Sequence, residues 1–184
     1  MKKTIFGAAI ILAAAFAFTG ASQAQNSPMP IPGVDAVVDV PGAGELPDKN
    51  LTYKLVFDLD RASETMDKVN PGLTFIAHYI NTLAKYGVPE SHRKMVVVFH
   101  QQGTWAILTD AAYQAKYKMT NPNIALMNDM KRAGVDFRVC GQSVHFNKIE
   151  RSDIQPIVQV DLWAGTTITT LMMRGYAHIS ANFR

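Results

Sequence analysis

Short apolar runs alternate with longer segments of helical periodicity along most of the chain. The apolar runs lie at residues 51–58, 94–100, 135–140, 157–160 and 176–179. Segments whose apolar residues recur at helical spacing lie between them, at residues 70–87, 110–118, 121–134 and 161–175. Short, mostly apolar runs are typical of strands covered on both faces. The alternation predicts a single-domain α/β fold: a mainly parallel five-stranded sheet of flavodoxin-like type with helices on both faces.

Two of the helical segments open on the same dipeptide. Asn-Pro stands at 70–71 and again at 121–122. Asparagine is a preferred N-cap residue and proline suits the first helical position, so we expect a helix to begin at each dipeptide. Glycines at 87 and 134 then mark the helix ends. A shorter helical stretch is expected at 105–108, and the periodicity leaves the order of the strands open.

The first 24 residues have the pattern of a signal peptide. Lys2 and Lys3 precede an apolar run at 4–18, and small residues at 22–24 offer a cleavage site after Ala24. An uncleaved anchor helix is the alternative, but the run is shorter than the ~20 residues that a bilayer span needs. We therefore expect a periplasmic protein, secreted through a cleaved leader, with no stable membrane insertion after cleavage.

Loss of the leader changes the charge of the chain. The full sequence has 18 basic and 15 acidic residues, and removal of Lys2 and Lys3 leaves a net charge of +1. A nearly neutral chain lacks the basic surface on which nucleic-acid binding depends. Residues 25–50 hold five of the nine prolines and three glycines, with few large apolar residues. We expect a disordered lead-in at 25–50 and one domain at 51–184.

The chain has a single cysteine, Cys140, at the end of the apolar run 135–140. A lone secreted cysteine is an inert core residue, an intermolecular link or a reactive sulfur. Parallel sheets collect their ligands outside the carboxyl ends of their strands. Because His100 ends the run 94–100, the fold predicts that Cys140 and His100 lie on one edge, with the sulfur open to solvent.

Residues around Cys140 favour a reactive thiolate, the form in which cysteine is nucleophilic. Gly141 allows close approach to the backbone, and the N–H groups of Gly141, Gln142 and Ser143 form a candidate anion-binding nest. Arg138 projects to the same strand face as Cys140. We expect these four residues to bind substrate.

His100 is the candidate that adds a charge or a proton at Cys140, and a hydrogen-bonded residue at the edge of the sheet is the alternative. Together with His145, these two residues would suit zinc or copper, but a second cysteine and a close ligand pair are lacking, so no metal is expected. Glycine-rich nucleotide-binding motifs are also absent from the sequence, so no cofactor is expected. Asp58 is interpreted as part of an acidic loop, and His178 supports no role.

Four segments resemble the DsrE/DsrF-like family of sulfur-relay proteins, in an exported branch. They are Tyr-Lys-Leu-Val-Phe-Asp at 53–58, Val-Val-Val-Phe-His at 96–100, Lys-Arg-Ala-Gly-Val-Asp-Phe-Arg-Val-Cys-Gly at 131–141, and Leu-Met-Met-Arg-Gly-Tyr-Ala at 171–177. The resemblance implies a DsrE-like α/β sheet assembled into a homotrimer or homohexamer. It also implies that Cys140 carries sulfane sulfur and passes it to a partner. The relay members are cytoplasmic, so the usual sulfur donors are absent from the compartment to which the leader points.

The first hypothesis is therefore a periplasmic carrier that relays sulfane sulfur as a persulfide on Cys140. Its partners are a sulfur donor or acceptor protein, or a small thiol or polysulfide. Whether it is a sulfurtransferase-like enzyme stays open. The alternatives are an oligomeric module that binds a small ligand without catalysis, and a thiol redox sensor in which Cys140 pairs with a partner's cysteine.

Overall fold

The computed structural model describes residues 29–183, and within them the strands form one five-stranded sheet in the order β4-β3-β2-β1-β5. The strands are β1 (Tyr53–Leu59), β2 (Arg93–Phe99), β3 (Asp136–Cys140), β4 (Val158–Asp161) and β5 (Ala177–Ser180). Every neighbouring pair is parallel. The predicted fold class is thus confirmed. The predicted leader at 1–24 lies outside the described residues.

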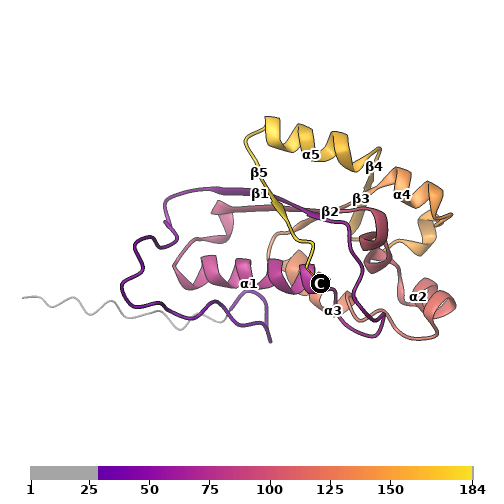
Figure 1. Cartoon of the computed structure of the whole chain (residues 1–184), viewed down its shortest axis with the longest axis horizontal. Helices are drawn as coiled ribbons and strands as arrows, with labels where there is room; N and C mark the ends of the chain where they lie inside the picture. The colour runs from indigo at the N-terminus through magenta and orange to yellow at the C-terminus, as the bar shows by residue number, and fades with distance from the viewer. Residues whose placement is uncertain (1–28, 184) are drawn as a thin grey trace, which may run out of the picture.

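Helices cover both faces of the sheet (Figure 1). The α-helices are α1 (Pro71–Lys85), α2 (Asp110–Tyr117), α3 (Ile124–Arg132), α4 (Gly141–Phe146) and α5 (Ala164–Met173). Short 3-10 helices are η1 (Glu90–His92), η2 (Gln101–Ile107) and η3 (Arg151–Asp153). α1 and α3 pack on one face, and α5 crosses the other at the top of the view in Figure 1. None of the helices in residues 29–183 has the length and apolar character needed to cross a bilayer.

The two faces of the sheet bury cores of unequal size. Phe57, Phe99 and Phe137 lie in the large core beneath α1 and α3. Val56 and Val98 point the other way, into a small cluster beneath α5. This split follows from the alternation of side chains along a strand, which sends successive residues to opposite faces. The site described below lies on the α5 face.

The start of α1 follows the sequence prediction and the start of α3 does not. Asn70 accepts a hydrogen bond from the Gly72 N–H at 2.9 Å, and proline occupies the first turn. α3 begins only at Ile124. Asn121 is buried and instead donates its side-chain N–H groups to the carbonyls of Ala106 at 2.9 Å and Leu108 at 2.7 Å. The predicted helix start at 121 is therefore wrong: the Asn121 Oδ1 accepts from the Asn123 N–H at 3.0 Å and closes a turn ahead of α3.

The described part of the predicted lead-in, residues 29–50, contains no helix or strand. Ile31 anchors it, since this side chain is fully buried in the large core. Asn81 of α1 accepts from the Ile31 N–H at 2.9 Å and donates to the carbonyls of Ile31 at 2.8 Å and Val34 at 2.6 Å. The segment therefore lies against α1 through a buried contact.

Candidate functional site

The structure brings Cys140 and His100 to the same edge of the sheet. β2 and β3 pair in parallel, with Val98 opposite Arg138 and Phe99 opposite Val139. His100 and Cys140 are the next residue of each segment, so they lie side by side at the carboxyl ends. Alternation places both side chains on the α5 face. The described residues contain no hydrogen bond between the two side chains.

Cys140 is buried rather than open to solvent. The residue is 3% exposed and packs with Val56, Val98, Ala164 and Leu171. α5 covers the sulfur because the helix begins at Ala164, next to the carboxyl end of β3. The sequence predicted the correct edge, and its prediction of an exposed sulfur is wrong.

Polar donors nevertheless reach the buried sulfur. Burial raises the pKa of the Cys140 thiol, but hydrogen bonds from the Ala164 backbone, the Ser143 backbone and hydroxyl, and the Gln142 backbone outweigh it. The net pKa of Cys140 is lowered. Hydrogen bonds to a charged form favour that form. The pKa of Cys140 is therefore lowered although the residue packs among hydrocarbon side chains.

The Gln142 and Ser143 donors come from a helix that the sequence pattern did not predict, whereas the Ala164 donor belongs to α5. Residues 141–143 were expected to form a loop, and they are instead the first residues of α4. The backbone of α4 starts directly after Cys140, so its first N–H groups point back toward the strand end. Gln142 and Ser143, whose amides were expected to form an anion-binding nest, thus lie in a helical turn rather than a loop, and their binding of an anion stays a prediction.

Gly141 is required by the fold of the chain itself. A Cβ atom at this position would lie 2.6 Å from the Asp161 carbonyl oxygen and 3.3 Å from that of Leu162. The Gln142 side chain also donates to the Leu162 carbonyl at 3.3 Å. The space beside Gly141 that was expected to admit a substrate is therefore filled by the segment that follows β4.

Arg138 is engaged by two carboxylates. Its guanidinium donates to Asp136 at 2.7 and 2.9 Å and to Asp161 at 3.4 Å. Burial lowers the pKa of Arg138, while the hydrogen bonds and charges of Asp136 and Asp161 raise it, and the net direction is upward. Binding of an anionic substrate by Arg138 would compete with these ion pairs.

His100 lies beside a carboxylate that the sequence did not single out. Its Nε2 is buried without a hydrogen-bond partner and is 3.6 Å from Asp58 Oδ2. The other oxygen of Asp58 accepts from His178 Nε2 at 2.9 Å, and Asn182 Nδ2 donates to Oδ2 at 3.2 Å. Asp58 is therefore an acceptor within the sheet rather than part of an acidic loop. Sequence analysis missed the pairing because it depends on β5 lying next to β1.

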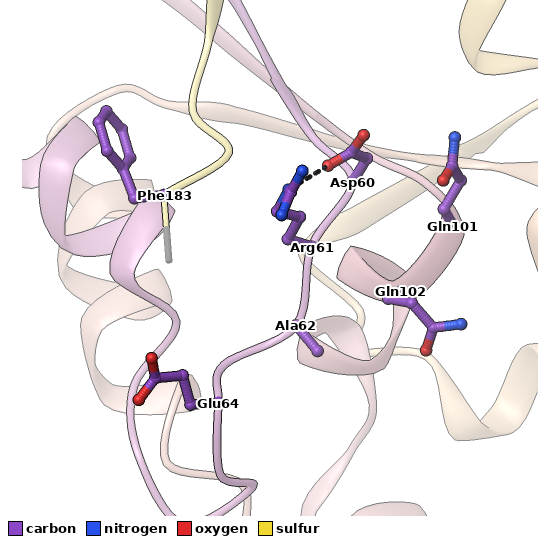
Figure 2. A pocket seen from close by; sticks show the side chains of 7 residues that line it. All are labelled: Asp60, Arg61, Ala62, Glu64, Gln101, Gln102 and Phe183. Carbon is purple, nitrogen blue, oxygen red and sulfur yellow. Dashed lines mark ion pairs between the residues drawn. The ribbon is translucent and has the colours of Figure 1, made fainter.

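A pocket of about 400 Å³ opens beside these residues, at the carboxyl ends of β1 and β2 (Figure 2). Its lining residues are Asp60, Arg61, Ala62, Glu64, Gln101, Gln102 and Phe183. Figure 2 shows Arg61 reaching toward Asp60, with 3.8 Å between Arg61 Nε and Asp60 Oδ1. Neither Cys140 nor His100 lines this pocket. It is a separate candidate for binding a small polar ligand.

A family model described as the DsrE/DsrF-like family matches residues 46–181. The chain belongs to the DsrE/DsrF-like family. The matched residues include the whole sheet, Cys140 and His100. This membership is consistent with sulfur relay, and it leaves the role of each residue to be tested. No curated protein resembles the chain significantly in sequence.

A solved structure shows that the DsrE-like fold extends to a distant protein. The protein of unknown function MTH1491 from Methanobacterium thermoautotrophicum is 20% identical to the chain, with a TM-score of 0.52. The match covers 70% of this chain and 98% of that one. At this identity the likeness concerns the fold alone.

His145 does not join the other two residues that were considered for a metal. It is exposed on α4. Across the described part of the chain, no group of three or more histidine, cysteine or acidic side chains is arranged to hold a metal ion.

Proposed function

We propose that this DsrE/DsrF-like protein carries sulfane sulfur as a persulfide on Cys140. The observation that supports the proposal is the set of donors from Gln142, Ser143 and Ala164 directed at the sulfur. They lower the pKa of Cys140 although the residue is buried. Donors placed in this way stabilise a negative charge, whether it is on a thiolate or on a persulfide anion.

The loading step needs no oxidant. The Cys140 thiolate attacks the sulfane sulfur of a donor R–S–SH, so that the S–S bond of the donor breaks and a new S–S bond forms on Cys140. The products are Cys140–S–SH and R–S⁻, and the leaving thiolate takes up a proton. Transfer to an acceptor thiol is the same exchange in reverse, in which a thiolate attacks the outer sulfur.

The burial of Cys140 narrows the choice of donor. Because the residue is only 3% exposed beneath Ala164 and Leu171, a bulky partner reaches the sulfur only if α5 moves. A small anion needs less displacement. We therefore favour a small thiol or polysulfide over a donor or acceptor protein as the immediate partner.

We further propose that the carrier is periplasmic and homo-oligomeric. The pattern at 1–24 supports export. Phe146, Leu162 and Met173 are 77%, 77% and 84% exposed around α4 and α5, and such apolar surface supports assembly into a homotrimer or homohexamer. Cell fractionation tests the location, and light scattering coupled to size exclusion tests the assembly. A mature chain that keeps residues 1–24 would contradict export through a cleaved leader. A monomer in solution would contradict the homo-oligomer.

Mass spectrometry of the intact protein tests persulfide formation. After incubation with inorganic polysulfide or thiosulfate, the protein should gain about 32 Da, the mass of one sulfur atom. Cys140→Ser should show no gain, and dithiothreitol should remove it from the wild type. An unmodified thiol after exposure to both donors would contradict the proposal.

The pocket in Figure 2 supports a second function, the binding of a small polar ligand without catalysis. Trp105 reports on this pocket because its Nε1 donates to Gln102 Oε1 at 3.0 Å. A ligand should change the tryptophan fluorescence equally in wild type and Cys140→Ser. Loss of the change in Cys140→Ser would instead join the pocket to the thiol. The redox-sensor alternative predicts a mixed disulfide on non-reducing gels, and burial of the sulfur disfavours it.

A further inference from the structure

One carboxylate lies between two histidines on the face of the sheet that carries Cys140. Asp58 is 3.6 Å from His100 Nε2 through one oxygen and accepts from His178 Nε2 at 2.9 Å through the other. Asn182 also donates to the first oxygen at 3.2 Å. The Asp58 side chain is only 15% exposed. Its position is therefore fixed from two sides.

The order of the strands explains how Asp58 reaches both histidines. β1 lies between β2, which leads to His100, and β5, which carries His178. The strands are parallel, and their register places His178 opposite Val56 and Asp58 opposite Val98. The three side chains therefore lie on the α5 face at successive levels toward the carboxyl ends of the strands. Cys140 ends β3, which lies on the other side of β2, so the cysteine is next to His100. The chain thus places a thiol, an imidazole, a carboxylate and a second imidazole in a row across four strands.

Few other charges face this row. α5, which covers it, contains no charged residue between Ala164 and Met173. Arg138 lies beside Cys140, but Asp136 and Asp161 hold its guanidinium. Asp60, two residues after Asp58, faces the same side of the sheet near His100, and its Oδ1 is buried without a hydrogen-bond partner. Lys54, at the other end of the strand, contacts the Arg174 carbonyl at 3.5 Å, and Asp60 lies near Arg61.

The buried Nε2 atom of His100 indicates what Asp58 does. This nitrogen has no hydrogen-bond partner, and Asp58 Oδ2 lies at 3.6 Å, just beyond hydrogen-bonding distance. A buried N–H without a partner is costly, and a small closure brings it to the carboxylate. An imidazole that donates through Nε2 has its other nitrogen free to exchange a proton.

We propose that Asp58 is a positioning residue for Cys140, acting through His100, and this inference rests on the proposed sulfur-carrying function. His100 accepts the thiol proton, and the Asp58 carboxylate stabilises the positive charge that the ring then gains. The thiolate attacks the sulfane sulfur of the donor, and His100 returns the proton to the leaving thiolate. One S–S bond breaks and one forms, and His178 with Asn182 keeps the carboxylate in place.

The pH profile of Cys140 alkylation by iodoacetamide tests the inference in the purified chain. Asp58→Asn keeps the shape of the side chain and removes its charge. We expect the midpoint of the profile to rise by about one pH unit, so that alkylation below the midpoint slows about tenfold. Asp39→Asn is the matched control, because Asp39 is also ion-paired, with Lys85 at 2.8 Å, but lies beside α1. Overlapping profiles for Asp58→Asn and wild type would overturn the inference.

A double-mutant cycle separates positioning from a structural role. In a His100→Gln background, Asp58→Asn should no longer move the midpoint, because the intermediate imidazole is gone. His178→Asn provides a second test should Asp58→Asn fail to fold. It frees the carboxylate for His100, so the midpoint should fall, and a rise or no change would overturn the inference.

The sulfur-loading measurement is independent of these profiles. A protein that gains sulfur on Cys140 but shows no dependence on Asp58 refutes the inference and leaves the proposed function intact. If alkylation depends on Asp58 but the protein never gains sulfur, the positioning role of Asp58 stands. The proposed sulfur-carrying function is then refuted.

Discussion

The Gln101 backbone N–H donates to the Ser143 hydroxyl oxygen at 3.1 Å. This bond joins the segment after β2 to the helix after β3. The Ser143 side chain is also one of the groups that lower the pKa of Cys140, so it acts on both the segment that follows His100 and the thiol. Gln101 has a φ of 46°, a left-handed conformation that is uncommon for a side chain of this kind. The edge of the sheet is thus held together at Ser143.

Ser143→Ala should make the Cys140 thiol less acidic. The substitution removes one of the hydrogen bonds that lower the pKa of Cys140 and leaves the Gln101 N–H without its acceptor. Near pH 7 we expect alkylation by iodoacetamide to slow about fivefold. Ser152→Ala, at an exposed position in η3, is the matched control. Equal rates for the wild type and Ser143→Ala would show that the hydroxyl does not act on the sulfur.

The lowered pKa of Cys140 also predicts how stability depends on pH. The unfolded thiol ionises near 9.0 and the folded thiol below it, so the folded state loses the proton first as the pH rises. The contribution of Cys140 ionisation to the free energy of unfolding is complete above the pKa of the unfolded thiol. It disappears as the pH falls through the pKa of the folded thiol. The free energy of unfolding of wild type minus that of Cys140→Ser should therefore increase from neutral to alkaline pH. Each unit of pKa difference contributes about 1.4 kcal/mol. A difference that stays constant from neutral to alkaline pH would contradict the lowered pKa.

Gly141→Ala should destabilise the fold and disturb the site together. Its new Cβ would lie 2.6 Å from the Asp161 carbonyl oxygen, so the backbone after β4 has to move. We expect a loss of about 1–3 kcal/mol in the free energy of unfolding, measured with urea. Gly44→Ala is the matched control, because a Cβ there meets nothing within 4 Å. Equal midpoints for the two variants would disprove the close approach at Gly141.

Asn81→Ala should release the segment at 29–50 from α1. It removes the buried partner of the Ile31 N–H and of the carbonyls of Ile31 and Val34. Buried groups left without partners should reduce the free energy of unfolding by about 2–4 kcal/mol, and proteases should cleave at 29–50 more readily. Asn50→Ala, at an exposed position, serves as the control. Unchanged cleavage of Asn81→Ala would show that these bonds do not hold the segment.

The sequence predicts the sheet better than it predicts the site. Apolar runs place each strand within two residues of its observed start, because strands covered on both faces exclude most polar residues. The start of α3 and the whole of α4 were missed. Asn121 closes a turn before α3 through its bond to the Asn123 N–H, and the six residues of α4 are too few to show a helical period.

The environment of Cys140 could not be predicted for a related reason. Its burial depends on where α5 docks, and the partner of Asp58 depends on β5 lying next to β1. Neither the docking of α5 nor the pairing of β5 with β1 produces a recognisable pattern in the amino-acid sequence. The sequence was sufficient to place His100 and Cys140 on one edge, because each ends a predicted strand of a parallel sheet, and the structure adds that the two strands are neighbours.

The mass of the peptide that contains Cys140 shows whether this residue carries sulfur. After polysulfide treatment and blocking with iodoacetamide, the account predicts a carbamidomethylated peptide heavier by about 32 Da than the untreated control, with the extra sulfur located on Cys140. Dithiothreitol should return the peptide to its original mass. A Cys140 peptide without added sulfur, in a protein whose thiol is alkylated normally, would contradict the account.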